Sequence, residues 1–132
     1  EALRRVFAEV AAQMSTAGGF GGFLQVSEGL HVDYTGAVPR ISFQGRPLND
    51  KKMYTVVTID FLANGGNGLV SFTDAAQVES TGLMSSDIFL KYLRDSQVVC
   101  PTIEGRIKTT PSGTKYKMPK GVVKSIPKPR FD

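Results

Sequence analysis

The sequence predicts an α+β fold (α/β layers), in which a mixed β-sheet packs with two main helices and an extended basic tail follows. Three observations lead to this class. Apolar side chains recur at helical spacing near the N-terminus and again near residue 90, β-prone runs lie between these segments, and Pro and Lys dominate the C-terminal end. The length of 132 residues and the hydrophobic content of 41% suit one globular domain. No apolar run approaches the ~18 residues of a membrane-spanning helix.

Two segments carry the helical pattern. Residues 2–14 place their apolar side chains in one stripe at i, i+3, i+4 and i+7 spacing, which is typical of a helix packed on a core. A glycine-rich loop is expected at 15–22. Residues 86–94 predict the second helix, with Ser85 or Ser86 as its N-cap. We expect one face of that helix to lie in the core, and its members are Phe89, Tyr92 and Leu93.

Between and after the helices, apolar alternation and β-branched runs predict short strands. The predicted strands are 23–27, 30–34, 40–44, 53–59, 98–99 and 103–107. The run MYTVVTI at 53–59 is almost entirely apolar or β-branched, so we expect a central strand that is buried on both faces. Glu28-Gly29 predicts a bend or bulge, and residues 45–50 have the composition of a turn.

The formal charge of +4 is concentrated at the C-terminal end. Residues 109–132 hold six basic side chains and one acidic one, whereas residues 1–108 hold ten basic and eleven acidic ones. We therefore divide the chain into a folded domain at 1–108 and a basic Pro/Lys-rich tail at 109–132. The body shows no basic pattern interleaved with aromatics, which argues against nucleic acid as a partner. Attraction of the tail to polyanions or a membrane surface is an alternative.

The chain has one cysteine and one histidine, which limits its chemistry. It cannot form an internal disulfide, and the two side chains fall short of the four ligands that zinc usually takes. We expect Cys100 to be a small buried hydrophobe, with pairing to a cysteine elsewhere in a longer parent as the alternative. His31 lies on the polar face of a predicted strand beside Asp33, so we expect a surface residue without a catalytic role.

The segment 60–68 (DFLANGGNG) is the most unusual stretch. Three glycines in four residues cost backbone entropy, which is reasonable where the chain needs positive φ or a close approach. Phe61 lies where the predicted strand ends and this loop begins, so its ring could lie at the edge of the core instead of inside it. Asn64 and Asn67 offer amide groups suited to hydroxyls or a base edge. The alternative is a tight connection with a core Phe and turn-forming Asn residues.

The second such segment is 21–27 (GGFLQVS), where Phe23 again follows glycines. Two aromatic rings 38 residues apart in the sequence could face each other across a slot. A flat heteroaromatic ring between them would gain contact on both faces, and a base-stacking aromatic is worth ~1–3 kcal/mol. The alternative is that both rings are ordinary core residues.

These two segments, with a third, resemble the C-terminal, substrate-binding domain of the 5′-nucleotidase family. That family includes ecto-5′-nucleotidases, UDP-sugar hydrolases, apyrases and 2′,3′-cyclic phosphodiesterases. The resemblance runs from about Leu3 to Lys108, without the domain's usual opening strands. It rests on GGFLQVSEGLHVDY, RISFQGRPLNDKKMYTVVTIDFLANGGNG and VVCPTIEGRIK, in this order.

The resemblance implies which residues bind substrate. The base of a nucleoside or nucleotide would be clamped between the rings of Phe23 and Phe61. The family's ribose-binding position falls on Asn67, where the family usually has Asp, and an amide is a weaker acceptor than a carboxylate. The complete set of expected substrate-binding residues is Phe23, Phe61, Asn64, Gly65, Gly66 and Asn67.

The resemblance also implies a hydrolase of nucleotide catabolism located outside the cytoplasm. Hydrolysis would use two divalent metal ions in an N-terminal metallophosphatase domain. With His31 as its one histidine, this chain is expected to hold no catalytic or metal-binding residue and to be inactive alone. We expect it to be a piece of a longer protein.

Two further expectations complete the sequence interpretation. A diverged, non-catalytic nucleotidase-like binding module is the alternative function, because Asn67 and an extra Glu28 depart from the family pattern. Absence of the opening strands would leave an exposed sheet edge, which would promote a dimer.

Overall fold

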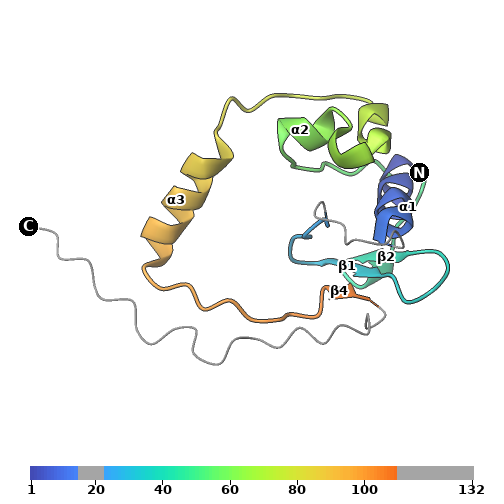
Figure 1. Ribbon diagram of the computed structural model, residues 1–132, viewed down its shortest axis with the longest axis horizontal. Coiled ribbons are helices and arrows are strands. Elements are labelled where there is room, and N and C mark those ends of the chain that lie inside the picture. The colour runs from blue at the N-terminus through green and yellow to red at the C-terminus, as the bar shows by residue number, and fades with distance from the viewer. Residues whose placement is uncertain (15–22, 110–132) are drawn as a thin grey trace, which may run out of the picture.

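The computed structural model describes residues 1–14 and 23–109. Helix α1, a small sheet and a group of short helices lie together, and helix α3 stands apart from them (Figure 1). The helices are α1 (Ala2–Met14), α2 (Asp60–Ala63) and α3 (Ser85–Ser96), with two 3₁₀ helices, η1 (Gly66–Gly68) and η2 (Val70–Asp74). The strands are β1 (Leu30–Asp33), β2 (Arg40–Phe43), β3 (Arg46–Pro47) and β4 (Ile107–Lys108).

Helix α1 confirms the prediction made from the apolar stripe at 2–14. The helix buries Val6, Phe7 and Val10, which lie on one face because residues three and four positions apart are neighbours on a helix surface.

The first turn of α1 contains two arginines, where the helix dipole disfavours positive charge. Tertiary ion pairs offset this effect. The Nε of Arg4 lies 2.6 Å from Oδ1 of Asp50, and Nη2 of Arg5 lies 2.7 Å from Oδ2 of Asp74. The Arg4 contact lowers the pKa of the Asp50 carboxyl. These pairs connect α1 to two distant parts of the chain.

The sheet has the strand order β3-β2-β1-β4 and is mixed. Strands β1 and β2 are antiparallel, with Val32 opposite Ile41, whereas β1 and β4 are parallel, with Val32 opposite Ile107. The α+β class with a mixed sheet is therefore confirmed, as are the predicted strands at 30–34 and 40–44 to within a residue at one end.

The core lies between α1, the sheet and the segment that contains η2. Val32 and Ile41 are buried because alternate residues of a strand share one face, while His31 and Arg40 are exposed on the opposite face. The buried core side chains are Val6, Phe7, Val10, Val32, Tyr34, Ile41, Leu48 and Leu69. Full burial of such an apolar side chain contributes roughly 1.5–3 kcal/mol, so this cluster is a main favourable contribution to folding.

The prediction of a central, buried strand at 53–59 is wrong. The segment forms no strand, and its apolar side chains Met53, Val56, Val57 and Ile59 are exposed. Hydrophobic and β-branched residues favour an extended backbone, but burial on both faces requires layers above and below the strand. Among the described residues, the sheet ends at β3 and β4, and no strand pairs with this segment.

Helix α3 confirms the second predicted helix but not its environment. Phe89, Tyr92 and Leu93, expected in the core, are exposed. Met84 occupies the N-cap position without a side-chain cap, so the predicted serine cap is absent. Periodicity is a local property, whereas burial depends on a second layer, and α3 buries no residue of its own against the described chain.

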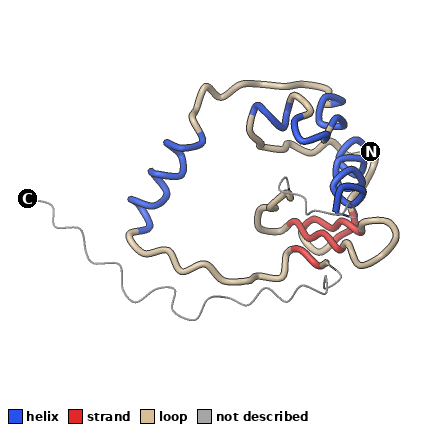
Figure 2. The backbone as a smooth tube through the Cα atoms, in the orientation of Figure 1, coloured by secondary structure: helices blue, strands red, loops and turns tan. Residues whose placement is uncertain are grey.

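The remaining C-terminal predictions are only partly confirmed. Of the late strands at 98–99 and 103–107, only Ile107 takes part in a strand, and the connection from α3 to β4 is drawn as loop in Figure 2. Cys100 was expected to be buried and is exposed. Residues 23–27 form no strand either, although Phe23 packs against the core.

The predicted loop at 15–22 and the basic tail, apart from its first residue, lie outside the described residues. None of the helices in the described part of the chain has the length and apolar character needed to span a bilayer.

Candidate functional site

The predicted loop at 60–68 has a defined local structure. Asp60 begins helix α2, where its Oδ1 accepts the N–H of Phe61 (2.8 Å). The carbonyl of Asp60 accepts two hydrogen bonds from Asn64, one from the backbone N–H (3.0 Å) and one from the side-chain amide (2.8 Å). The sequence prediction of a loop missed this helical turn, because four residues are too few for a periodic signal.

Phe61 is held at the surface by contact with a glycine. Its side chain is 54% exposed. A Cβ at Gly66 would lie 2.5 Å from Cε1 of the Phe61 ring and 2.5 Å from the Phe61 carbonyl oxygen. Only a residue without a side chain fits there, so Gly66 is required for the close approach of the ring to the backbone.

Three residues that follow α2 have positive φ. The φ angles are +82° at Gly65, +56° at Asn67 and +71° at Gly68. Glycine adopts this region without steric cost, and Asn is among the non-glycine residues that tolerate it best. The Asn67 carbonyl accepts a hydrogen bond from Nε2 of Gln13 in α1 (2.9 Å). The loop therefore turns back on itself and is fastened to the first helix.

A second set of contacts fastens the next helix, η2, to α1. The carboxylate of Glu9 accepts the hydroxyl of Ser71 (2.7 Å) and its N–H (3.2 Å). Leu69, directly before η2, is fully buried. These contacts, with the Arg5–Asp74 ion pair, set the position of the loop that precedes them.

Phe23 lies in a different environment from Phe61. Its ring is partly buried and packs on Tyr34, with ring centroids 5.8 Å apart and an interplanar angle of 53°. Burial of Tyr34 raises the pKa of its phenol to about 12. The Tyr34 hydroxyl is buried and has no hydrogen-bond partner among the described residues.

The structure thus brings five of the six predicted site residues together in one loop. Phe61 projects from α2, and Asn64, Gly65, Gly66 and Asn67 follow directly. The sixth, Phe23, belongs to the periphery of the core. The ring contacts found in the described part of the chain join Phe23 to Tyr34 and Phe43 to Tyr54. The clamp of Phe23 and Phe61 remains a prediction.

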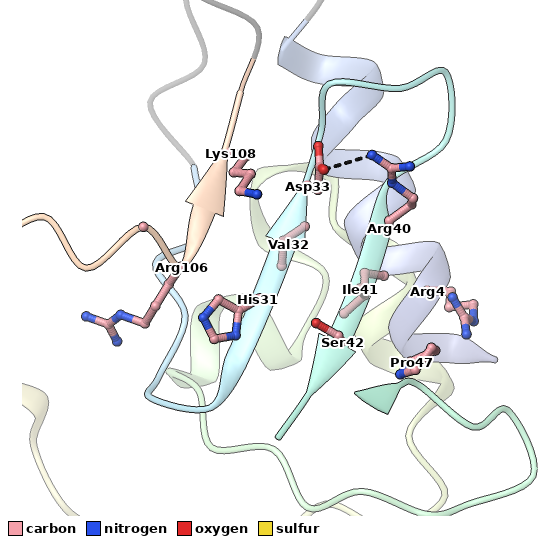
Figure 3. A pocket seen from close by; sticks show the side chains of 11 residues that line it. Arg4, His31, Val32, Asp33, Arg40, Ile41, Ser42, Pro47, Arg106 and Lys108 are labelled. Atoms are coloured by element: carbon pink, nitrogen blue, oxygen red, sulfur yellow. Dashed lines mark hydrogen bonds and ion pairs between the residues drawn. The ribbon is translucent and has the colours of Figure 1, made fainter. Parts of the chain in front are cut away.

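A separate cavity of about 510 Å³ lies on the open face of the sheet, and Figure 3 shows its lining. His31 and Asp33 project from β1, and Ser42 projects from β2. None of the six predicted site residues lines it. Four cationic side chains do, namely Arg4, Arg40, Arg106 and Lys108.

Asp33 is the acidic member of this lining. Its Oδ1 accepts the Thr35 hydroxyl (2.6 Å) and N–H (2.9 Å), and Oδ2 accepts Nη2 of Arg40 (2.9 Å). These donors, Thr35 first, lower the pKa of Asp33 to about 2. Asp33 is therefore ionised at neutral pH and neutralises part of the positive charge around it.

Comparison with known proteins gives the family. The model of the 5′-nucleotidase C-terminal domain matches residues 1–75, more than half of the chain. This chain belongs to the 5′-nucleotidase C-terminal domain family. The match includes α1, strands β1–β3, α2, η1 and η2, and it ends before α3 and β4. The loop with Phe61 and the helix that anchors it both lie within the matched region.

Individual relatives agree with this assignment. The chain is 34% identical over 62 residues to a 5′-nucleotidase of Diplobatis ommata, a match that covers 47% of this chain and 11% of the relative. It is 37% identical over 71 residues to the trifunctional nucleotide phosphoesterase protein YfkN of Bacillus subtilis, covering 53% of this chain and 5% of that protein. Protein UshA of Yersinia enterocolitica is 29% identical over 91 residues, with 69% and 16% covered.

The matches span only a small part of the relatives' length, between 5% and 16% for these three. No solved structure matches the chain significantly.

The described residues of this 5′-nucleotidase-family domain contain no cluster of three or more His, Cys, Asp or Glu side chains that could hold a metal ion. The described residues therefore offer no site for the two metal ions that the family resemblance implies. No step of hydrolysis is assigned to this part of the chain.

Sequence reasoning missed the residues that position the loop. The helical pattern at 2–14 gives Glu9 and Gln13 no role, because both lie off the apolar stripe, yet they bind Ser71 and Asn67. It also missed the convergence of cations on the open sheet face. The alternation in β1 and β2 was a usable signal for that face, because it places His31 and Arg40 on the same side.

Proposed function

We propose that this domain recognises the nucleoside part of a nucleotide for a 5′-nucleotidase-type phosphohydrolase. The base would stack on Phe61, with Phe23 as the second ring of a clamp, and the loop amides of Asn64 and Asn67 would contact ribose hydroxyls or the base edge. The proposal rests on family membership together with the surface position of Phe61.

The exposure of Phe61 is the observation that carries the proposal. Phe61 is 54% exposed, so part of its ring is open to a ligand, and the chain holds the ring in that position. The 2.5 Å separation between the ring and a hypothetical Cβ at Gly66 means that ring and loop backbone are closely packed. A ring fixed in this way offers a flat stacking face at little cost in conformational entropy.

The geometry around the loop supports recognition, not bond chemistry. Asn67 is exposed, and its amide can both donate to and accept from a diol. Positioning the nucleoside would bring the phosphate to a metal centre in another domain of the parent protein, where phosphate-ester hydrolysis would occur. The parent would then be a hydrolase located outside the cytoplasm, as the family resemblance implies.

A second candidate is a nucleotidase-like binding module that has lost catalysis. The observation that favours it is Asn67 at the position where the family usually carries Asp, which would weaken binding of the ribose diol. Asn67→Asp separates the two candidates. A nucleotide-recognition domain should bind adenosine more tightly after this substitution, whereas a module that has lost its ligand should bind adenosine in neither form.

The direct test is calorimetric titration of the chain with adenosine. Phe61→Ala should weaken binding roughly 5- to 150-fold, which corresponds to ~1–3 kcal/mol for one stacking ring. Phe89→Ala is the matched control, because Phe89 is 60% exposed and lies in α3, outside the family match. Phe23→Leu removes the second ring while it keeps an apolar side chain beside Tyr34.

In the full-length parent, the same Phe61 and Phe23 substitutions should raise the KM for a nucleoside monophosphate. Equal KM values in the parent and both variants would reject the clamp. Hydrolysis of a nucleoside monophosphate by the isolated chain with added divalent metal would reject the assignment of catalysis to another domain.

A further inference from the structure

The glycine-rich loop contains two Asn-Gly sequences, Asn64-Gly65 and Asn67-Gly68. In such a sequence the backbone nitrogen of the glycine can attack the side-chain amide carbon of the preceding asparagine, because glycine has no side chain to block the approach. The attack forms a cyclic succinimide, and hydrolysis of the succinimide leaves a carboxylate in place of the amide. Both sites have the same Asn-Gly sequence, so a large difference between them must come from the structure.

The Asn64 site is held by hydrogen bonds. The side-chain Nδ2 of Asn64 donates to the carbonyl of Asp60 (2.8 Å). The N–H of Gly65, which is the attacking group, donates to the carbonyl of Leu62 (2.9 Å). Both bonds must break before a ring can close at Asn64, so the helical turn α2 protects this amide.

The Asn67 site lacks this protection. Asn67 and Gly68 are both exposed, so water and hydroxide reach the reacting groups. The side-chain amide of Asn67 makes no hydrogen bond to any residue that the structure describes. The N–H of Gly68 belongs to the single 3₁₀ turn η1, and hydrogen-bond geometry is poorer in a 3₁₀ helix than in an α-helix.

The backbone at Asn67 adds a second difference. Asn67 has φ +56° and ψ +23°, which is left-handed, whereas Asn64 has φ −91° and ψ +17°. A residue with a Cβ is strained in the left-handed region, so rotation out of that region relieves strain. Ring closure needs such a rotation, because it brings the Gly68 nitrogen to Cγ of Asn67. The bond from Nε2 of Gln13 to the Asn67 carbonyl (2.9 Å) resists it.

We propose that Asn67 is a site of spontaneous deamidation and that the fold confines the reaction to this one of the loop's two Asn-Gly sequences. The Gly68 nitrogen bonds to Cγ of Asn67, the bond from Cγ to Nδ2 breaks, and the Gly68 proton leaves with that nitrogen as ammonia. One water then opens the ring. The net reaction turns one amide and one water into a carboxylate and ammonium, without an oxidant or a reductant.

Both ways of opening the ring place a negative charge in the loop. Water that attacks Cγ gives aspartate, whose carboxylate replaces the Asn67 amide. Water that attacks the backbone carbonyl gives isoaspartate, whose free carboxylate is the group that accepts the hydrogen bond from Gln13 in the unreacted chain. The loop gains an acceptor of higher charge in either case.

The added charge has a consequence for nucleoside binding, and this consequence rests on the proposed function. A carboxylate can accept hydrogen bonds from both hydroxyls of a ribose diol, and charge-assisted bonds are stronger than those of an amide. Deamidation of Asn67 therefore raises the affinity of the loop for a nucleoside after the chain has been made. A bound nucleoside covers Asn67 and slows the reaction.

Peptide mapping by mass spectrometry is the first test. The unmodified chain is held at mildly alkaline pH in water labelled with heavy oxygen, which adds the label to each new carboxylate. Label should appear at position 67 about 5-fold faster than at position 64, or faster still, because a hydrogen bond holds the Asn64 amide. In urea the two rates should become similar, since both sites are then unstructured Asn-Gly sequences.

Two variants test the structural argument. Gln13→Ala removes the bond to the Asn67 carbonyl and should accelerate deamidation at position 67 by about 2- to 10-fold, with the rate at position 64 unchanged. Asn67→Gln keeps an amide and should stop the reaction at position 67, because the longer side chain would have to close a larger ring. Circular dichroism checks that both variants keep the fold.

Calorimetric titration with adenosine tests the consequence. Ion exchange separates the part of the aged chain that carries the extra negative charge. This fraction and Asn67→Asp should bind adenosine about 5-fold more tightly than the freshly prepared chain. If none of the three binds adenosine, the proposed function fails, whereas the deamidation itself is measured by the label and stands apart from it.

Two results would overturn the proposal. One is label that appears at position 64 as fast as at position 67 in the folded chain. The other is a folded chain that gains no label at position 67 during the time in which the urea-unfolded chain is converted, which would mean that the fold protects both amides.

Discussion

Helices α1 and α3 are 13 and 12 residues long and carry the same kind of amphipathic pattern, yet only α1 buries its apolar side chains. α1 packs on the sheet and on η2, with Leu69 buried in that contact region. α3 stands apart and buries no residue. The comparison shows that an amphipathic stripe is sufficient to predict a helix, whereas its burial depends on whether the chain supplies a second layer.

The two helices are also stabilised differently. α3 has Asp87 in its first turn and Arg94 in its last, which suits the helix dipole, and Lys91 and Asp95 pair at i, i+4. α1 has no acid in its first turn and no base in its last. Local electrostatics thus support α3, and tertiary contacts support α1.

The largest loss of folding stability should come from truncating Leu69, which is buried beneath α1. Leu69→Ala removes a fully buried side chain and leaves a cavity, so it should lower the free energy of unfolding by ~2–5 kcal/mol. Leu90→Ala in α3 is the matched control and should cost less than ~0.5 kcal/mol, because Leu90 is exposed. Urea unfolding followed by circular dichroism measures both. Equal losses would mean that α3 packs as tightly as α1.

A smaller effect should come from the polar contact between α1 and η2. Glu9→Ala leaves the N–H and hydroxyl of buried Ser71 without their acceptor, and it should cost ~1–3 kcal/mol. Glu104→Ala removes an exposed ion pair with Arg106 and should cost less than ~1 kcal/mol. The same unfolding measurement applies. If the Glu104 variant lost more stability than the Glu9 variant, the ranking of the two regions would be wrong.

The smallest effect should be a loss of folding stability at acid pH, caused by protonation of Asp33 in β1. The folded-state pKa of Asp33, about 2, lies below its ordinary value of 3.8, so the stabilising contribution of this carboxylate is complete above pH 3.8. It should disappear as the pH falls from 3.8 towards 2. Unfolding midpoints across that range should therefore fall more in the original chain than in Asp33→Asn. Parallel curves would show that the Thr35 and Arg40 contacts do not stabilise the ionised form.

Local patterns predicted the elements better than their surroundings. The helix at 2–14 and the strands around Val32 and Ile41 were predictable, because their side chains alternate between a core face and a solvent face within a few residues. The segment 53–59 gave the opposite outcome. Its composition is that of a central strand, but only the arrangement of the sheet determines whether neighbouring strands exist on either side.

The candidate site was predictable in part for the same reason. The glycines at 65, 66 and 68 indicated positive φ and close approach, and the structure has Gly66 under the ring of Phe61 and Gly65 and Gly68 at positive φ. The contacts that hold this loop were not predictable. Glu9 and Gln13 bind residues 62 and 54 positions away, and no local pattern indicates that such distant residues meet.

The sequence by itself determined helices α1 and α3, the polar face of β1 and β2 and the glycine-rich loop at 60–68, because these depend on neighbours within about one turn or one strand. Only the tertiary structure decided that Phe61 is exposed, that Phe23 packs on Tyr34 and that the segment 53–59 pairs with no strand of the described chain. Whether a side chain is buried, or a strand is paired, depends on which other segment of the chain packs against it. They are decided where distant parts of the chain meet, as α1 and η2 do here.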